Sequence, residues 1–564
     1  MANLSQLRRQ RMLAFLEKMR EQHKDDDEVL VAINEVENEI NEKKYGLVWE
    51  EHSEEVEERM VDEVPIFVED KDKEITMTDN GYNFLLEGDN LHSLHLLEKT
   101  HKEKIDVIYI DPPYNTGSDD FRYDDNYIDS NDSFRHSKWL SFMAARLSIA
   151  RRLLKDTGVV WISIDENELF NLKELCDSIF GDNNFRSIVT VMANPGGRDY
   201  GGIAKTTEYL LVYSKTPDAM IAKIPDSDHV FTDKDEYGAF EVRELRNRNI
   251  KFNDQNRPNL CYPFYVDGDS EDEHGLYSVS LEPDEKHTIE VMPLKSRGIQ
   301  TVWRWGKEQK SRANLNINVK AKKKRDGSFM IVEKYRDELV MMKNTWLEKK
   351  YRTENGTLQL KEIFEDQPFG YPKPVDIPRK LISSSPRKDS VVLDFFAGTG
   401  TTGQAVLELN KEDGGNRHFI LCTNNENNIC DDVTYPRLQT VITGTRSNGS
   451  KYSDGIPADL KYYRTDFIPK KSESLATDLI THIDEMIQLE YGVKIDKEKY
   501  ISILTDEDAD ELEKNWANYP NIRAIYISRQ VLLTGKQKEL FGTHDCFTIP
   551  DYYFREELRE AGEA

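Results

Sequence analysis

The stretch KIDVIYIDPPYNTG, residues 104–117, decides the fold expected for this chain. Its first seven residues have the pattern of a buried strand, and the two prolines after Asp111 end that strand because they cannot donate hydrogen bonds to a sheet. Strand patterns at 83–89 and 158–164 alternate with amphipathic helix patterns at 93–101, 136–155 and 168–180. The alternation predicts an α/β fold with a parallel sheet, whose reactive residues lie at the carboxyl ends of the strands.

The same alternation returns at SVVLDFFAGTGTTG, residues 390–403, which precedes a helix pattern and the strand HFILCT at 418–423. The intervening sequence is irregular and looks like an insertion that splits the sheet. We therefore expect five parts: an N-terminal helical segment at 1–60, sheet-forming parts at 61–225 and 365–445, an insertion at 226–364, and a C-terminal α/β domain at 446–564. The acid-rich residues 51–73 are expected to form a solvated connector.

Composition excludes several classes of protein. The chain has 564 residues, 38% of them hydrophobic, and a net charge of −28. No apolar run approaches the roughly 18–20 residues of a membrane span, and the first residues lack the features of a signal peptide. Five cysteines without a CxxC pair predict a reducing, cytoplasmic setting and no zinc site. The net charge, taken alone, argues against a nucleic-acid partner.

The residues after the first strand are suited to bind an exocyclic amine. Pro112 and Pro113 fix the backbone, so that the Asp111 carboxylate and the Pro112 carbonyl can point the same way. Paired acceptors match the two N–H donors of an amine, and holding both hydrogens makes the nitrogen more tetrahedral as it attacks an electrophilic carbon. Tyr114 offers an aromatic face on which a planar base could stack. Asp-Pro-Pro alone would equally suit an ordinary strand-ending turn.

The residues after the second strand are suited to bind a nucleoside. Gly398, Gly400 and Gly403 at a strand-to-helix turn allow a ligand close to the backbone, and the helix offers free N–H groups. The pattern GxxxxGK[ST] occurs nowhere in the chain, so a phosphate-binding loop is not expected. A nucleoside with a small zwitterionic tail, such as S-adenosylmethionine, is a better-suited ligand for this turn than a nucleotide phosphate.

Together, DPPYNTG and DFFAGTG resemble the β class of amino-DNA-methyltransferases, which methylate adenine N6 or cytosine N4. The catalytic motif precedes the cofactor motif, which is the permuted order of that class, and the insertion between them matches its target-recognition domain. The chain is most similar to modification (Mod) subunits of type III restriction–modification systems, through YGLVWEEH, EGDNLHSL, GTLQLKEIF, FGYPKP and IPDYYF. This resemblance begins near residue 45. It implies a Rossmann-like, circularly permuted, S-adenosylmethionine-dependent methyltransferase sheet.

The resemblance also implies residue roles. Asp111, Pro112, Pro113 and Tyr114 would hold and activate the target amine. The cofactor pocket would be lined by Asp89, Tyr371, Pro372, Lys373, Asp394, Phe395, Gly398, Gly400, Thr401 and Glu426.

Two positions depart from the family pattern. Thr423 stands where the family has an acid that holds the cofactor ribose, so Glu426 or Asn425 is expected to replace it. Residues 207–209 read Thr-Glu-Tyr where the family often has His-Glu-Tyr. Only Tyr209 is therefore carried over, as an aromatic that helps to hold a flipped base.

The implied function is site-specific methylation of adenine N6 in double-stranded DNA, by direct transfer from sulfur to nitrogen without a metal. Methylation of cytosine C5 is excluded because no Pro-Cys occurs. Cytosine-N4 methylation, RNA-adenine methylation and a non-enzymatic DNA-recognition module that recruits a nuclease remain alternatives. Without a phosphate-binding loop, DNA cleavage would need a separate restriction (helicase and nuclease) subunit. Apolar stripes in the first 45 residues fit a homodimer.

Sequence specificity is expected from the insertion. Residues 291–350 contain 16 Lys and Arg against 6 Asp and Glu, whereas residues 261–290 contain 1 Lys against 9 acids. Basic residues with interleaved aromatics and Asn suit phosphate contacts and base readout. The expected DNA-binding residues are Arg304, Lys307, Arg312, Lys322, Lys323, Lys324 and Arg325. Trp303 and Trp305 are more typical of core anchors. DNA binding should be confined to this basic region and should depend strongly on salt concentration, because the rest of the surface is acidic.

Overall fold

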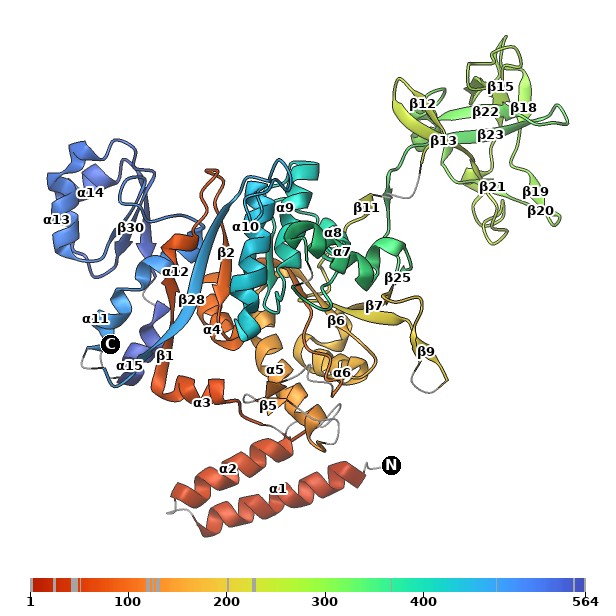
Figure 1. Ribbon diagram of the computed structural model, residues 1–564. Coiled ribbons are helices and arrows are strands. Elements are labelled where there is room, and N and C mark those ends of the chain that lie inside the picture. Colours follow the sequence, from red (N-terminus) through yellow and green to blue (C-terminus); the bar gives the residue numbers. More distant parts are fainter. Residues whose placement is uncertain are drawn as a thin grey trace. The chain divides into compact units, whose positions relative to one another are not determined.

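The chain forms two compact units in the computed structural model: residues 1–222 with 343–564, and residues 223–342 (Figure 1). The residues that the structure describes are 4–23, 27–41, 49–50, 52–117, 122–123, 126–127, 132–199, 202–225, 230–366, 368–472, 474–550 and 553–561.

A ten-stranded sheet forms the centre of the first unit and confirms the predicted α/β fold. Its six middle strands run parallel, and β1 and β10 run antiparallel to their neighbours in that group. Across the sheet, the strands are β1 (Glu63–Glu69), β28 (Asp459–Pro469), β2 (Tyr82–Glu87), β27 (His418–Thr423), β26 (Val391–Asp394), β3 (Ile105–Ile110), β6 (Leu154–Ile164), β10 (Thr207–Ser214), β7 (Phe185–Met192) and β25 (Thr345–Trp346).

Helices pack against the sheet in two groups. The chain crosses from β2 to β3 in one direction and from β26 to β27 in the other, so right-handed crossovers place their connecting helices on opposite faces. One group is α4 (Asn90–His101), α5 (Arg135–Leu153) and α6 (Leu169–Phe180). The other is α8 (Asp376–Ser383), α9 (Thr401–Asp413) and α10 (Tyr435–Thr443). Because helices cover both faces, all six residues of β3 are buried.

The sheet order brings the two predicted motifs together. Strand β3 ends immediately before Asp111, and β26 ends at Asp394. These strands are parallel neighbours, with Val392 opposite Val107, so their carboxyl ends lie at the same edge of the sheet. The catalytic and cofactor motifs are thus adjacent in space although the insertion separates them in sequence.

The second unit is built on a five-stranded sheet of β12 (Asp233–Asp235), β13 (Gly238–Glu244), β23 (Phe329–Tyr335), β22 (Val319–Lys323) and β16 (Leu276–Tyr277). Shorter strands complete it: β14 (Arg246–Asn247), β15 (Phe264–Val266), β17 (Val279–Ser280), β18 (Ile289–Val291), β19 (Lys295–Ser296), β20 (Ile299–Gln300) and β21 (Val302–Trp303). Its core includes Trp303, which is 2% exposed and donates its indole N–H to the Tyr262 carbonyl at 2.7 Å. Trp303 is thus a core anchor.

The two ends of this unit are paired with each other. β11 (Ile224–Pro225) and β24 (Leu339–Val340) form an antiparallel pair, with Ile224 opposite Val340. The boundary predicted at residue 364 is too late. β25 and α7 (Thr353–Phe364) belong to the first unit, because β25 pairs with β7 in the main sheet.

The terminal segments follow the predictions in part. α1 (Leu4–Gln22) and α2 (Asp27–Asn41) form a helical hairpin in which Arg20 binds Asn34 and Glu37, each at 2.6 Å. The connector predicted at 51–73 is wrong: it contains α3 (Glu55–Asp62) and β1, whose Val64 and Phe67 are buried.

The C-terminal domain starts later than residue 446, because β28 belongs to the main sheet. Beyond it, α11 (Leu475–Ile480) and α12 (Ile483–Tyr491) precede a parallel three-stranded sheet of β29 (Tyr500–Ile503), β30 (Ala524–Ser528) and β31 (Asp545–Ile549). The remaining helices there are α13 (Asp506–Lys514), α14 (Gly535–Phe541) and α15 (Arg555–Ala561). This sheet and α13 and α14 share a small core.

Candidate active site

The loop after β3 carries the predicted catalytic residues, and its backbone is held from α5. The Trp139 indole donates to the Pro113 carbonyl at 2.8 Å, and Trp139 is fully buried. Within the loop, the Tyr114 hydroxyl donates to Asp111 Oδ1 at 2.8 Å. Asp111 and Tyr114 are therefore oriented before any ligand binds.

A lysine and a second carboxylate converge on this pair. Lys373 Nζ lies 2.6 Å from Tyr114 Oη and 3.4 Å from Asp111 Oδ1, and it forms an ion pair with Glu208. Lys373 lies just before α8 and Glu208 lies on β10, so the cluster joins three distant segments of the chain. Sequence reasoning assigned Lys373 to the cofactor pocket and did not select Glu208.

The charges around Asp111 compete. Burial raises the pKa of Asp111, the Lys373 ammonium lowers it, and the Glu208 carboxylate raises it. Burial would lower the pKa of Lys373, but the two carboxylates raise it above its usual value. Lys373 is therefore a permanent cation that favours the ionised, hydrogen-bond-accepting form of Asp111.

Asn115, the residue after the DPPY motif, is anchored by a buried carboxylate. It is fully buried with a φ of 57°, and its Nδ2 donates to Glu168 Oε1 at 2.5 Å. Glu168 is also fully buried and contacts His136 Nδ1 on α5 at 2.5 Å. The left-handed backbone at Asn115 is thus fixed by two neighbouring elements, a support that sequence reasoning missed.

The predicted cofactor loop after β26, residues 394–401, has the backbone that its glycines predict. Gly398 and Gly400 have φ values of 48° and 76°, which favour glycine. The Asp394 carboxylate accepts from the Phe396 N–H at 3.0 Å and from the Thr402 hydroxyl. Burial raises the pKa of Asp394 to about 7, against these two hydrogen bonds.

Two buried arginines support the cofactor loop, and neither was selected from the sequence. On α10, Arg437 donates to the hydroxyls of Thr399 at 3.0 Å and Thr401 at 2.8 Å. On α5, Arg146 donates Nε to Asn90 at 2.6 Å, and Asn90 in turn donates to the Phe395 carbonyl at 2.7 Å.

Arg146 also connects Asp89 to the N-terminal part of the chain. It is fully buried, binds Glu54 through two hydrogen bonds of 2.6 and 3.1 Å, and lies 3.6 Å from Asp89 Oδ1. Asp89 caps α4 by accepting from the Leu91 N–H at 2.7 Å. Glu54 is 8% exposed, so this is a buried ion pair.

The other predicted cofactor residues occupy varied environments. The Phe395 side chain is fully buried, so it supports the loop from within the core, and Pro372 is also buried. Tyr371 is 70% exposed. Glu426 is half-buried in the turn after β27. The alternative Asn425 accepts from the Cys430 N–H at 3.1 Å and donates to Asp431 at 2.7 Å.

The predicted base-binding Tyr209 is half-buried on β10, beside Glu208, and packs against the main core. The predicted DNA-binding residues of the second unit fall into two groups. Arg304, Lys307 and Arg312 pair with Glu333, Glu282 and Glu308. By contrast, the end of β22 and the turn before β23 form a basic hairpin of four residues: Lys322, Lys323, Lys324 and Arg325. All four are exposed except the half-buried Lys324.

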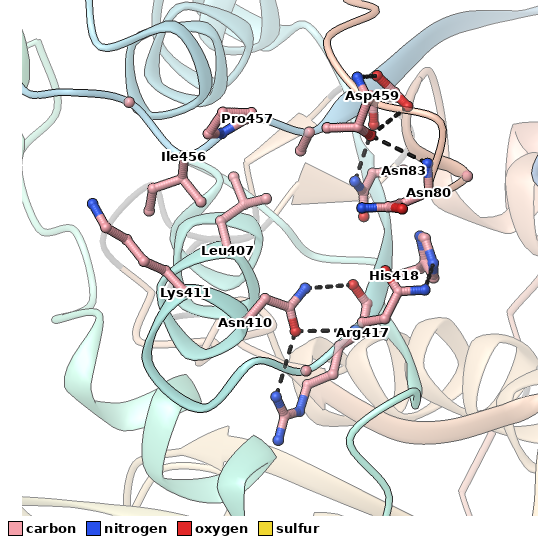
Figure 2. A pocket seen from close by; sticks show the side chains of 16 residues that line it. Asn80, Asn83, Leu407, Asn410, Lys411, Arg417, His418, Ile456, Pro457 and Asp459 are labelled. Atoms are coloured by element: carbon pink, nitrogen blue, oxygen red, sulfur yellow. Dashed lines mark hydrogen bonds between the residues drawn. The ribbon is translucent and has the colours of Figure 1, made fainter.

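A cavity of about 290 Å³ lies elsewhere, at the amino-terminal ends of β27 and β28 (Figure 2). Polar groups in its walls form hydrogen bonds with one another: Asn83 donates to the Asp459 carbonyl at 3.0 Å, and Arg417 donates to Asn410. None of the predicted site residues lines this cavity, so it is separate from the catalytic loop. Among the described residues, no group of three His, Cys, Asp or Glu is placed to hold a metal, and no helix could span a membrane.

Residues 105–434 match the family model N6_N4_Mtase, described as DNA methylase. The chain is 31% identical to the EcoPI Mod subunit of a type III restriction-modification enzyme from Escherichia phage P1, over 87% of this chain and 80% of that protein. It is 33% identical to the type II methyltransferase M.KpnI from Klebsiella pneumoniae, over 71% and 94%. The EcoP15I Mod subunit from Escherichia coli is 28% identical, over 87% and 80%.

Proposed function

This chain belongs to the N6_N4_Mtase family of DNA methylases, and from that premise we propose that it methylates adenine N6 at a specific DNA sequence as a Mod subunit. It is an S-adenosylmethionine-dependent DNA methyltransferase of the type III Mod kind, similar to Mod subunits over most of their length. The proposal rests on one observation. Asp111 and Tyr114 follow β3, the glycine loop follows β26, and these two parallel neighbours end at the same edge of the sheet.

Asp111 and the Pro112 carbonyl accept the two N–H groups of the target amine, and Tyr114 stacks on the flipped base. S-adenosylmethionine, bound at residues 394–401, supplies the methyl group as an electrophilic carbon. The residues fit this cofactor, because the glycine turn admits a ligand close to the backbone and the buried Asp394 can balance a cationic group. Catalysis then depends on orientation and on fixed acceptors.

Adenine is preferred over cytosine as the target because the motif begins with aspartate, as in the adenine enzymes that the sequence resembles. Analysis of the nucleosides in methylated DNA separates N6-methyladenine from N4-methylcytosine. Detection of N4-methylcytosine alone would overturn the assignment of the base and leave the methyltransferase activity intact.

Double-stranded DNA is the proposed partner of the second unit, through the basic hairpin of residues 322–325. The names of the Mod relatives describe subunits of restriction-modification enzymes. We accordingly propose a separate restriction subunit, a homodimer of this chain and a cytoplasmic location. Co-purification with a restriction subunit and the mass of the assembly in solution test the first two points.

The decisive test is Asp111→Ala. The variant should lose methyl transfer to DNA by at least about a thousand-fold while it still binds S-adenosylmethionine, because one of the two amine acceptors is gone. Asp182→Ala, in an exposed turn, is the matched control and should keep full activity. Methylation of DNA that persists unchanged in Asp111→Ala would refute the catalytic assignment. Long-read methylation profiling of DNA from an expressing host identifies the target sequence.

A further inference from the structure

The ammonium group of Lys373 lies beside Asp111, the carboxylate that the proposed mechanism assigns to the target amine. It is within 2.6 Å of the Tyr114 hydroxyl and 3.4 Å of Asp111 Oδ1. We propose that Lys373 occupies the amine site of the base-free enzyme as a resident cation, and that it withdraws from Asp111 and keeps its ion pair with Glu208 when the flipped base enters. The inference rests on the proposed function and assigns positioning roles to both residues.

The lysine and the base compete for the same groups. Lys373 carries three N–H donors, and its ammonium lies 3.4 Å from Asp111 Oδ1, one of the two acceptors that the proposed mechanism gives to the amine. The ammonium also lies 4.9 Å from the centroid of the Tyr114 ring, on which the base is expected to stack. A hydrogen-bonded nitrogen lies about 2.9 Å from its acceptor oxygen. The target amine and the Lys373 ammonium therefore cannot occupy this position beside Asp111 at the same time.

Glu208 gives the displaced lysine a second partner. It already forms an ion pair with Lys373, and its Oε2 lies 3.4 Å from Tyr114 Oη. A four-carbon side chain can rotate away from Asp111 while its ammonium keeps this contact. The backbone of the lysine loop has less freedom, because the Cβ position of Gly356 on α7 is 2.0 Å from the Pro372 carbonyl oxygen. The exchange therefore requires motion of the Lys373 side chain alone.

The pair has opposite effects on Asp111. Lys373 stabilises the ionised carboxylate, whereas Glu208 opposes ionisation through like charge. The charged or titratable groups that face Asp111 come from its own loop and from four other elements: Tyr114, Tyr109, Glu208, Lys373 and Asp394. Loss of Lys373 should raise the pKa of Asp111, and loss of Glu208 should lower it. A charge at this distance typically shifts a pKa by about 1 unit or more.

The experiment measures kcat/KM for DNA methylation against pH in two variants. Since Asp111 has to be ionised to accept the amine, the acid limb of the profile should move up by about 1 pH unit in Lys373→Met and down in Glu208→Gln. Lys373→Arg keeps the charge and should keep the wild-type limb. Lys361→Met on α7 and Glu174→Gln on α6 are exposed matched controls.

A second measurement does not depend on turnover. With 2-aminopurine at the target position of a cognate duplex and no cofactor, Lys373→Met should increase the emission of the flipped base several-fold, because the site is no longer filled. Lys373→Arg should not. Thermal unfolding confirms that each variant is folded, and Glu208→Gln and Lys373→Arg still test the inference if Lys373→Met is unfolded.

Two failures are distinguishable. A wild-type protein that transfers no methyl group to any DNA refutes the proposed function. If the wild type is active but the two acid limbs stay in place or move in the same direction, the methyltransferase assignment stands and the resident-cation inference is overturned.

Discussion

Replacement of the buried Arg146 should destabilise the first unit and loosen the cofactor loop. Arg146→Met removes the two hydrogen bonds to Glu54 and the bond to Asn90, and it leaves the Glu54 carboxylate, 8% exposed, without its counter-ion. Loss of one partner from a buried ion pair typically costs about 3–5 kcal/mol. Because Asn90 also holds the Phe395 carbonyl, we expect the Kd for S-adenosylmethionine to rise about ten-fold, equivalent to about 1.4 kcal/mol.

The loss of stability in Arg146→Met should grow with pH. Burial already raises the pKa of Glu54 although Arg146 lowers it, and without Arg146 that pKa rises further. A carboxyl group with a raised folded-state pKa contributes stability that is present below its unfolded value and is lost as pH rises through the folded value. Arg146→Met should therefore lose up to about 1.4 kcal/mol per pH unit relative to wild type between the folded-state pKa of Glu54 in wild type and its higher folded-state pKa in the variant.

Hydrogen exchange is the suitable assay, because it resolves α5 from the second unit where a global unfolding curve would not. The exchange free energy of α5 amides should fall by about 3–5 kcal/mol at pH 8 and by less at pH 5. Glu54→Gln in the Arg146→Met background should recover most of the loss, since no buried charge remains. A loss below about 1 kcal/mol at pH 8, or a double variant no better than Arg146→Met, would refute this account.

Three further predictions concern the cofactor, the DNA and the lysine loop. The pKa of Asp394 is near 7, so binding of the cationic cofactor at pH 7 should release up to about half a proton from this carboxyl group. Calorimetry in buffers of different ionisation enthalpy measures this release. Asp394→Asn should release no proton, and net proton uptake by the wild type would contradict the assignment. Replacement of the four basic-hairpin residues with Gln should weaken DNA binding and reduce the slope of log K against log salt by up to about 3.6, or about 0.9 per charge. Lys307→Gln with Arg312→Gln, whose charges are already paired, should change the slope little. Equal effects of the two replacements would point away from the hairpin. Gly356→Ala should lower methyl transfer at least ten-fold, because the added Cβ displaces the Pro372 backbone. Gly370→Ala, whose Cβ would enter open space, serves as the control. Full activity of Gly356→Ala would show that α7 can shift.

Much of the first unit follows from local sequence, because its strands and helices carry their periodicity and their stop signals within a few residues. The strand expected at 104–110 is β3, which ends before the two prolines as predicted. The strand expected at 390–396 is β26, which already ends at Asp394, ahead of the glycine turn. The edge strand β1 was missed because its acids suggested a solvated segment. Its partner β28 lies about 400 residues away in sequence, and only that pairing makes its apolar residues a strand.

The candidate site was predictable only where a motif carries it. Glu208 and Lys373 are 165 positions apart, and Glu54 and Arg146 are 92 apart, so no local pattern connects them. Charge counts likewise located a basic region in the insertion but could not distinguish Arg304, paired with Glu333, from Arg325, which is exposed. Pairing of charges is a property of the folded unit.

The short ladder between β11 and β24 has an evolutionary consequence. Because the second unit begins and ends at paired neighbours, Ile224 and Val340, its entire length forms a loop closed at its base. Recombination at these two points would exchange one target-recognition module for another without threading the chain or altering the order of the catalytic strands. New sequence specificities could therefore arise in a single genetic event while the methylation chemistry is inherited unchanged.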